Sequence, residues 1–211
     1  MKKIILASGS PRRKELLELM GVHFEIKVSN KEEKMTTQNP ADVVQELAKM
    51  KAFDIAEQSE ESCIVIGADT VVAVNENEIL GKPADRKNAF EMIKKIQGRE
   101  HKVYTGVALL EKNADGTVNE TVFVEETIVS VVALSDSEIE RYLDTKRPVE
   151  DGSLSGKDIY EWQDKAGGYG IQGTFAKYIS GIRGDYYNVM GLPVCRLYQE
   201  LKKAENRKEE K

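Results

Sequence analysis

Residues 4–17 read IILASGSPRRKELL, which predicts a short apolar strand, a loop of small residues and the start of a helix. Pro11 takes the place that proline prefers in a first helical turn, and Ser10 is a suitable N-cap. Arg12 and Arg13 follow in that turn, although a helix N-terminus carries unpaired N–H donors and a partial positive charge. The stretch therefore predicts a loop that binds a phosphate group, with two solvated arginines as the alternative.

A second informative stretch is CIVIGADTVVAV at residues 63–74, where one carboxylate interrupts a long apolar run. We expect two strands with a turn between them, in which Gly67 and Ala68 present Asp69. A carboxylate between apolar strands is costly unless it is solvated, hydrogen-bonded or bound to a metal. Asp69 is therefore a candidate functional acid, and an acid that caps a turn is the alternative.

The rest of the sequence mixes helical and strand patterns, without an internal repeat or a clear linker, and so predicts a mixed α/β fold. We expect one domain with two lobes over residues 1–211. The predicted helices cover residues 40–58, 85–97 and 136–144, and a last helix begins near residue 193. The predicted strands cover residues 24–29, 102–110 and 121–134. Residues 146–163 are polar and predict a long loop, and the charged tail at residues 202–211 is expected to fray.

Composition excludes several classes of protein. The 211 residues carry a net charge of −5, which is unfavourable for general nucleic-acid binding. No apolar run is long enough for a membrane helix, and the first residues do not form a secretory signal. Cys63 and Cys195 both lie among apolar residues, so we expect two buried thiols, no disulfide and a cytoplasmic location. Two histidines are too few for a histidine-rich metal site.

Positively charged residues stand out in this acidic chain. Lys51 falls within the apolar stripe of the helix predicted at residues 40–58, where it must extend to solvent or meet an anion. Lys82 lies in a Gly-Lys-Pro segment, and residues 164–173 are rich in glycine. Each signal alone is weak, but together with the two arginines they match the charges of a nucleotide polyphosphate site. The sequence has no GxxxxGK[ST] motif, so it does not predict a P-loop enzyme.

Six ordered motifs span most of the chain. They are SGSPRRKELL at residues 8–17, GADTVV at 67–72, GKPAD at 81–85, HKVYTGV at 101–107, DKAGGYGIQG at 164–173 and GDYYNVMGLP at 184–193. Together they resemble the Maf family of nucleotide pyrophosphatases over about residues 3–203. The resemblance implies an elongated mixed α/β fold similar to the inosine-triphosphate pyrophosphatases, with the site in a cleft between two lobes. It also implies hydrolysis of a nucleoside triphosphate to the monophosphate and pyrophosphate.

The resemblance further implies the site residues. Asp69 is the proposed general base, and Asp69 with Glu33 would hold Mg²⁺ or Mn²⁺, although Glu32 lies beside Glu33. The implied substrate-binding and specificity residues are Ser8, Arg12, Arg13, Lys51, Thr70, Lys82 and Gln172. Three of them, Arg12, Thr70 and Gln172, match the branch of the family that acts on dTTP and UTP.

Two alternative functions stay open from the sequence. One is a regulatory or binding protein of cell division, a role linked to this family by its septum-formation name. The other is the same reaction on a different nucleotide, such as 7-methyl-GTP. The expected partner is a small nucleoside triphosphate, with neither nucleic acid nor membrane, and a homodimer is left open. The chain departs from the family at residues 146–160, which predict an inserted surface loop.

Overall fold

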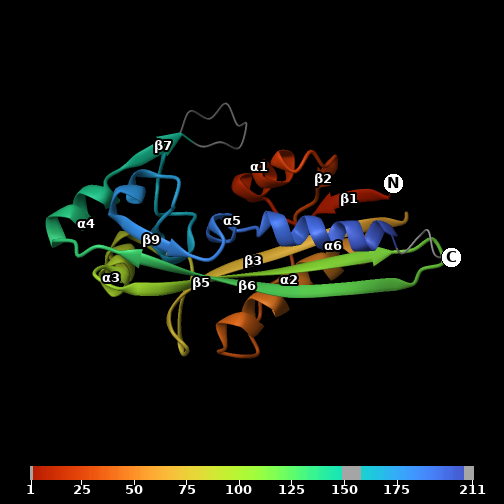
Figure 1. Cartoon of the computed structure of the whole chain (residues 1–211), viewed down its shortest axis with the longest axis horizontal. Coiled ribbons are helices and arrows are strands. Elements are labelled where there is room, and N and C mark those ends of the chain that lie inside the picture. The colour runs from red at the N-terminus through yellow and green to blue at the C-terminus, as the bar shows by residue number, and fades with distance from the viewer. Residues whose placement is uncertain (1, 149–157, 207–211) are drawn as a thin grey trace. The chain divides into compact units, whose positions relative to one another are not determined.

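The structure, a computed structural model, describes residues 2–148 and 158–206 and has the mixed α/β fold predicted (Figure 1). The α-helices are α1 (Pro11–Leu19), α2 (Pro40–Glu57), α3 (Arg86–Ile96), α4 (Asp136–Leu143), α5 (Tyr186–Met190) and α6 (Val194–Asn206). The strands are β1 (Lys3–Leu6), β2 (Phe24–Ile26), β3 (Cys63–Asn75), β4 (Glu78–Leu80), β5 (Glu100–Lys112), β6 (Val118–Val131), β7 (Lys146–Pro148), β8 (Asp158–Tyr160) and β9 (Ile179–Arg183). Two 3-10 helices, η1 (Ala166–Gly168) and η2 (Thr174–Tyr178), lie between β8 and β9 in the chain. None of the helices described here is long and apolar enough to cross a membrane.

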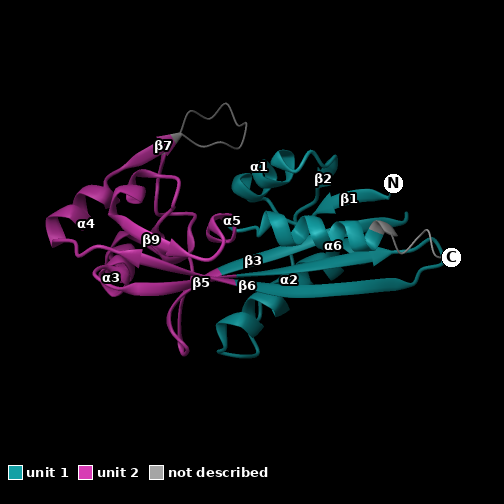
Figure 2. Ribbon diagram, viewed as in Figure 1, with its two compact units in different colours: residues 1–70, 105–125, 191–211 teal, residues 71–104, 126–190 magenta. Residues whose placement is uncertain are grey.

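One mixed sheet holds most of the strands, in the order β2-β1-β3-β5-β6-β9, with β4 paired to β3. Strand β1 runs parallel to β2 and β3, whereas β4 and β9 pair antiparallel with β3 and β6. The chain divides into two compact units, which Figure 2 colours separately. Unit 1 comprises residues 1–70, 105–125 and 191–211, and unit 2 comprises residues 71–104 and 126–190. Strands β3, β5 and β6 contribute residues to both units.

Helix α2 packs against β3 and β5 in unit 1. Its N-cap is Asn39, whose side chain accepts hydrogen bonds from the backbone N–H groups of Ala41 and Asp42. A Cβ atom on Gly67 of β3 would lie 2.2 Å from the carbonyl oxygen of Ala48 in this helix. A Cβ atom on Gly106 of β5 would similarly lie 2.3 Å from the Val44 carbonyl oxygen. The two glycines therefore let the helix backbone approach the sheet closely.

The predicted turn at residues 67–70 is wrong, because β3 is one continuous strand over Cys63–Asn75. Glycine in this segment serves close packing against α2 and does not reverse the chain. Asp69 therefore lies in the middle of a strand. Side chains alternate between the two faces of a strand, so Gly67 and Asp69 share the α2 face while Thr70 is on the opposite face.

Three further expectations need correction. Ser10 is at the N-cap of α1, but its side chain makes no capping hydrogen bond. Cys195 is exposed and only Cys63 is buried, because Cys195 lies on the outer face of α6. The loop predicted at residues 146–163 contains β7 and β8, which pair with each other.

Two predicted segments lie mostly or partly outside the described residues. These are residues 149–157, which form most of the predicted insertion, and residues 207–211 at the end of the charged tail.

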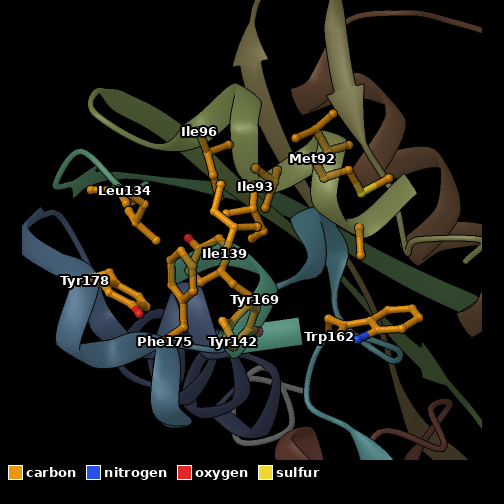
Figure 3. Packing of buried hydrophobic residues seen from close by; sticks show 14 of the residues in the cluster. Met92, Ile93, Ile96, Leu134, Ile139, Tyr142, Trp162, Tyr169, Phe175 and Tyr178 are labelled. Carbon is orange, nitrogen blue, oxygen red and sulfur yellow. The ribbon is translucent and has the colours of Figure 1, made fainter. Parts of the chain in front are cut away.

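Aromatic side chains dominate the core of unit 2 (Figure 3). Phe175 packs with its ring centroid 4.9 Å from those of both Tyr142 and Tyr169. His101 is 2% exposed beside them, and its Nε2 lies 2.6 Å from the Tyr169 hydroxyl oxygen. Burial disfavours the charged imidazolium and lowers the pKa of His101 from 6.5 to about 4. The imidazole is therefore neutral in the folded protein near neutral pH.

This neutral imidazole makes stability depend on pH. Because the pKa of His101 is lower in the folded than in the unfolded chain, the unfolded chain binds more protons between pH 4 and 6.5. We expect the free energy of unfolding to fall by about 2 kcal/mol from this group between pH 7 and pH 5. Urea unfolding at both pH values should show a smaller fall for His101→Gln than for the wild type. His23→Gln, at the exposed histidine, is the control, and an equal fall in all three proteins would contradict the prediction.

Candidate functional site

On the α2 face of β3, the candidate acid Asp69 forms an ion pair with a lysine of α2. Lys51 donates from Nζ to Asp69 Oδ1 at 2.6 Å and also lies 2.8 Å from Glu33 Oε1. The side chains of Lys51 and Asp69 are 16% and 14% exposed, while that of Glu33 is 53% exposed. The sequence predicts that Lys51 either extends to solvent or meets an anion, and the structure shows that it meets an anion. Two carboxylates separated by 36 residues in sequence converge on one ammonium group.

A second polar cluster occupies the opposite face of β3, around Arg13. Its guanidinium donates from Nε to the Gly191 carbonyl oxygen at 2.8 Å, from Nη1 to Ser8 Oγ at 3.2 Å and from Nη2 to Thr70 Oγ1 at 3.0 Å. Thr70 Oγ1 lies 2.9 Å from Thr105 Oγ1 on the neighbouring strand β5. Burial lowers the pKa of the Arg13 guanidinium, and the negative charge of Asp69 opposes this shift. Arg13 of α1 thus contacts β3 and the segment before α6 directly, and β5 through Thr70.

The segment between β1 and α1 keeps the features of an anion-binding loop. Ser8 is 8% exposed, and its Oγ accepts a hydrogen bond from the Ser10 backbone N–H at 3.3 Å. Helix α1 has no acidic residue in its first turn and no side-chain cap. Its N-terminal N–H donors are thus left without a capping side chain or carboxylate at this end of the helix. Arg12 is half-buried in the same turn.

The structure places the predicted site residues in two groups. Contacts within unit 1 bring together Ser8, Arg13, Glu33, Lys51, Asp69 and Thr70, in the two clusters just described. Lys82 and Gln172 belong to unit 2, where both are exposed. Lys82 follows β4, and Gln172 lies between η1 and η2. The cleft implied by the family resemblance, in which Arg12, Lys51, Lys82 and Asp69 would share one site, stays a prediction.

Two contact residues were not predicted from the sequence. Thr105 is fully buried, and a buried threonine in a strand resembles any β-branched core residue. Gly191 contributes only its carbonyl oxygen, which no side-chain pattern reveals. Both residues lie within the quoted motifs, Thr105 in HKVYTGV and Gly191 in GDYYNVMGLP, and this was the only signal available.

The contact between Thr70 and Thr105 predicts a coupled loss of stability. Thr70→Val and Thr105→Val each remove one hydroxyl from the pair and should lower the free energy of unfolding by about 1 kcal/mol. Because both changes remove the same hydrogen bond, the double variant should lose about 0.5–1 kcal/mol less than the sum. Urea unfolding of the four proteins measures this coupling. Strictly additive losses would show that the two hydroxyl groups do not interact.

The donor set around Asp69 can be compared with the needs of a divalent cation. Residues 2–148 and 158–206 contain no cluster of three or more His, Cys, Asp or Glu side chains suited to a metal ion. Magnesium, however, is usually held by one or two carboxylates together with substrate phosphates and water. Asp69 and Glu33 converge on one ammonium group, so their two charges exceed that of Lys51. These residues therefore fit a magnesium-type ion bound with its substrate.

Comparison with known proteins gives sequence matches over nearly the whole chain. The sequence model of a family described as "Maf-like protein" matches residues 3–204. A protein of Lachnoclostridium phytofermentans named dTTP/UTP pyrophosphatase is 47% identical over 203 residues, or 96% of this chain and 95% of the relative. A protein of Bacillus cytotoxicus with the same name is 48% identical over 207 residues, or 98% and 97% of the two chains. Among solved structures, the Staphylococcus aureus Ham1 protein is 12% identical with a TM-score of 0.48, over 97% of this chain and 100% of that one.

Proposed function

This chain belongs to the Maf-like protein family, and from that premise we propose that it hydrolyses dTTP and UTP to the nucleoside monophosphate and pyrophosphate. The family prediction made from the six motifs is confirmed. The relatives named dTTP/UTP pyrophosphatase match nearly the full length of the chain. The observation that carries the chemistry is the contact of Asp69 on β3 with Lys51 on α2, because Asp69 is next in sequence to Thr70, which Arg13 contacts.

In the proposed reaction, water attacks the α-phosphorus and pyrophosphate leaves. Asp69 takes a proton from the attacking water, and Lys51 holds the Asp69 carboxylate at 2.6 Å in a fixed position. The P–O bond between the α- and β-phosphates breaks as the new bond to the water oxygen forms. Arg12 and Lys82 would neutralise the charge that develops on the leaving pyrophosphate.

Other residues have supporting roles in this proposal. Arg13 has three donors occupied by protein acceptors, so it would hold Ser8 and Thr70 in place as well as supply charge. Gln172 would recognise the pyrimidine, since an amide can pair with a donor and an acceptor on the base edge. Asp69 and Glu33 would hold a Mg²⁺ or Mn²⁺ ion, whose chemistry is to neutralise phosphate charge and acidify bound water.

A screen of nucleoside triphosphates with pyrophosphate detection tests the function. We expect release from dTTP and UTP in the presence of Mg²⁺, and loss of release when EDTA removes the ion. Preference for 7-methyl-GTP would contradict the substrate but leave the reaction type standing. No hydrolysis of any triphosphate would contradict the enzyme and favour the role in cell division.

A cytoplasmic location and a homodimer also stay part of the proposal. Sedimentation of the protein in the presence of a reductant would measure the oligomeric state. A monomer under these conditions would exclude the homodimer and leave the proposed chemistry unchanged.

A further inference from the structure

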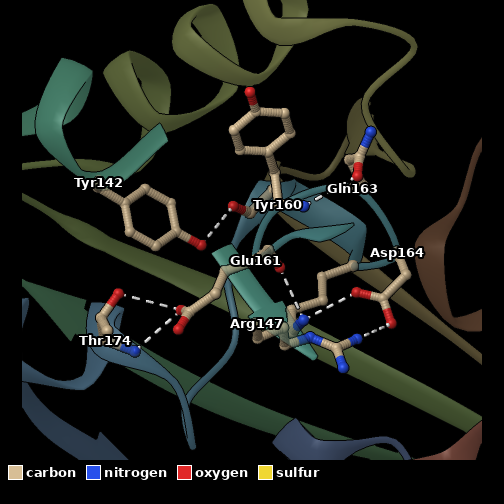
Figure 4. Close-up of polar contacts among 9 residues, drawn as sticks. Tyr142, Arg147, Tyr160, Glu161, Gln163, Asp164 and Thr174 are labelled. Carbon is tan, nitrogen blue, oxygen red and sulfur yellow. Dashed lines mark hydrogen bonds and ion pairs between the residues drawn. The ribbon is translucent and has the colours of Figure 1, made fainter. Parts of the chain in front are cut away.

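A buried carboxylate in unit 2 has no role in the chemistry above. Glu161 is 5% exposed and follows β8, at the start of the segment that carries the glycine-rich motif. Burying a carboxylate is costly unless hydrogen bonds compensate for the lost water. The hydrogen bonds of Glu161 therefore show which part of the chain the buried carboxylate stabilises (Figure 4).

The Glu161 carboxylate accepts two hydrogen bonds from one residue further along the chain. Glu161 Oε2 accepts hydrogen bonds from the Thr174 backbone N–H at 2.9 Å and from Thr174 Oγ1 at 3.1 Å. Thr174 is the first residue of η2, so the carboxylate binds the N-terminal end of this short helix. Figure 4 shows Glu161 directed towards Thr174. Hydrogen bonds to an ionised acceptor are stronger than neutral ones.

The glycines of the motif let buried charges approach the backbone. A Cβ atom on Gly173 would lie 2.4 Å from Glu161 Oε2, and one on Gly170 would lie 2.5 Å from Lys165 Cε. Lys165 is 8% exposed and donates from Nζ to the Glu161 carbonyl oxygen at 2.7 Å. Glu161 therefore fixes the chain at Thr174, after Gln172, by two hydrogen bonds, while the Lys165 side chain packs closely against Gly170 before it.

Gln172 is the exposed residue between these two contacts. Ile171 before it is buried at 9% exposure, while the Gln172 side chain is open to solvent. Close packing at Gly170 and the hydrogen bonds at Thr174 limit the directions in which the intervening amide can be presented. A fixed amide loses less conformational entropy when it binds a base than a mobile one.

We propose that Glu161 is a positioning residue for base recognition, which fixes Gly173 and Thr174 so that Gln172 is presented to a pyrimidine in one orientation. This inference rests on the proposed function, since it assigns Gln172 to the base. Glu161 itself contacts neither the base nor the phosphates in this proposal. It acts through the backbone of residues 172–174.

Binding of uncleavable nucleotides tests the inference apart from catalysis. Calorimetry with the α,β-imido analogues of dTTP and dATP gives the preference of each variant as a ratio of two Kd values. Glu161→Gln weakens the hydrogen bonds to Thr174, and Thr174→Val removes the hydroxyl donor alone. We expect each change to reduce the preference for the dTTP analogue about tenfold, the amount expected for one charged hydrogen bond. Thr174→Ser keeps the hydroxyl and should retain the preference.

The decisive control repeats both changes in a Gln172→Ala background, where they should no longer alter the preference. A preference that is unchanged in Glu161→Gln and Thr174→Val, or that falls equally with and without Gln172, would overturn the inference and leave Glu161 as a purely structural cap. Wild-type protein that binds the dTTP analogue but does not hydrolyse dTTP would refute the proposed function alone. Wild-type protein without preference for the dTTP analogue would overturn the inference even if hydrolysis occurs.

Discussion

Asp69→Asn should lower the turnover of dTTP and UTP about a thousandfold, the size expected for loss of a general base. Asparagine has nearly the same volume as aspartate and can still accept a hydrogen bond from Lys51, but it cannot take a proton from water. Lys51 would keep its contact with Glu33, so the folded state should persist. Steady-state pyrophosphate release measures the first effect, and urea unfolding measures the second.

Asp54→Asn is the matched control for this variant. Asp54 is a buried carboxylate of unit 1, on α2, where it accepts a hydrogen bond from Ser29 Oγ at 2.6 Å. Its replacement removes a negative charge from the same unit but leaves the contacts of Asp69 intact. Turnover should stay within about threefold of the wild type, because the effect of a charge outside the site is small. Near-normal pyrophosphate release from Asp69→Asn would refute the assignment of the base.

Gly67→Ala should lower the free energy of unfolding by about 3 kcal/mol or more, as overpacking against a rigid backbone does. The added methyl group would lie 2.2 Å from the Ala48 carbonyl oxygen and 2.9 Å from the Ala52 Cβ and backbone N. Neither Ala48 nor Ala52 has a flexible side chain that could move aside. Helix α2 would have to shift away from β3, and Lys51 on that helix would lose its distance to Asp69. Urea unfolding and turnover should therefore both be impaired.

Gly181→Ala provides the comparison for this substitution. In β9 the nearest atom to an added Cβ would be Ser130 Oγ at 4.0 Å, which is ordinary contact. Its effect on stability should be within about 1 kcal/mol. Equal stability of the two alanine variants would mean that α2 does not pack closely on β3.

The ends of several helices could be predicted because local side chains determine them. The helix predicted at residues 136–144 begins after Ser135, whose capping box with Glu138 has both of its hydrogen bonds. Gly98, just after α3, has φ of 68°, a conformation that favours glycine. Strand lengths were less predictable, since β5 and β6 extend beyond the apolar residues into polar ones that pair across the sheet. Gly67 was misinterpreted because its requirement comes from a helix carbonyl that is distant in sequence.

The candidate site was predictable where a charged residue stands among apolar residues in the sequence. Lys51 within an apolar stripe and Asp69 between apolar runs are such conflicts, and the structure pairs them with each other. Glu33 was identified only through the family resemblance, because a solvated polar loop gives no local signal. Thr105 and Glu161 could not be predicted, since their importance depends on partners that the fold brings close.

The exposed position of Cys195 on α6 has a practical consequence for measuring the oligomeric state. Cys63 is buried, so Cys195 is the thiol that air and alkylating reagents reach. Two chains that meet through this residue would oxidise to a covalent pair that migrates as a dimer on a non-reducing gel. Cys195→Ser prevents this artefact, so a dimer that persists in that variant is held by non-covalent contacts.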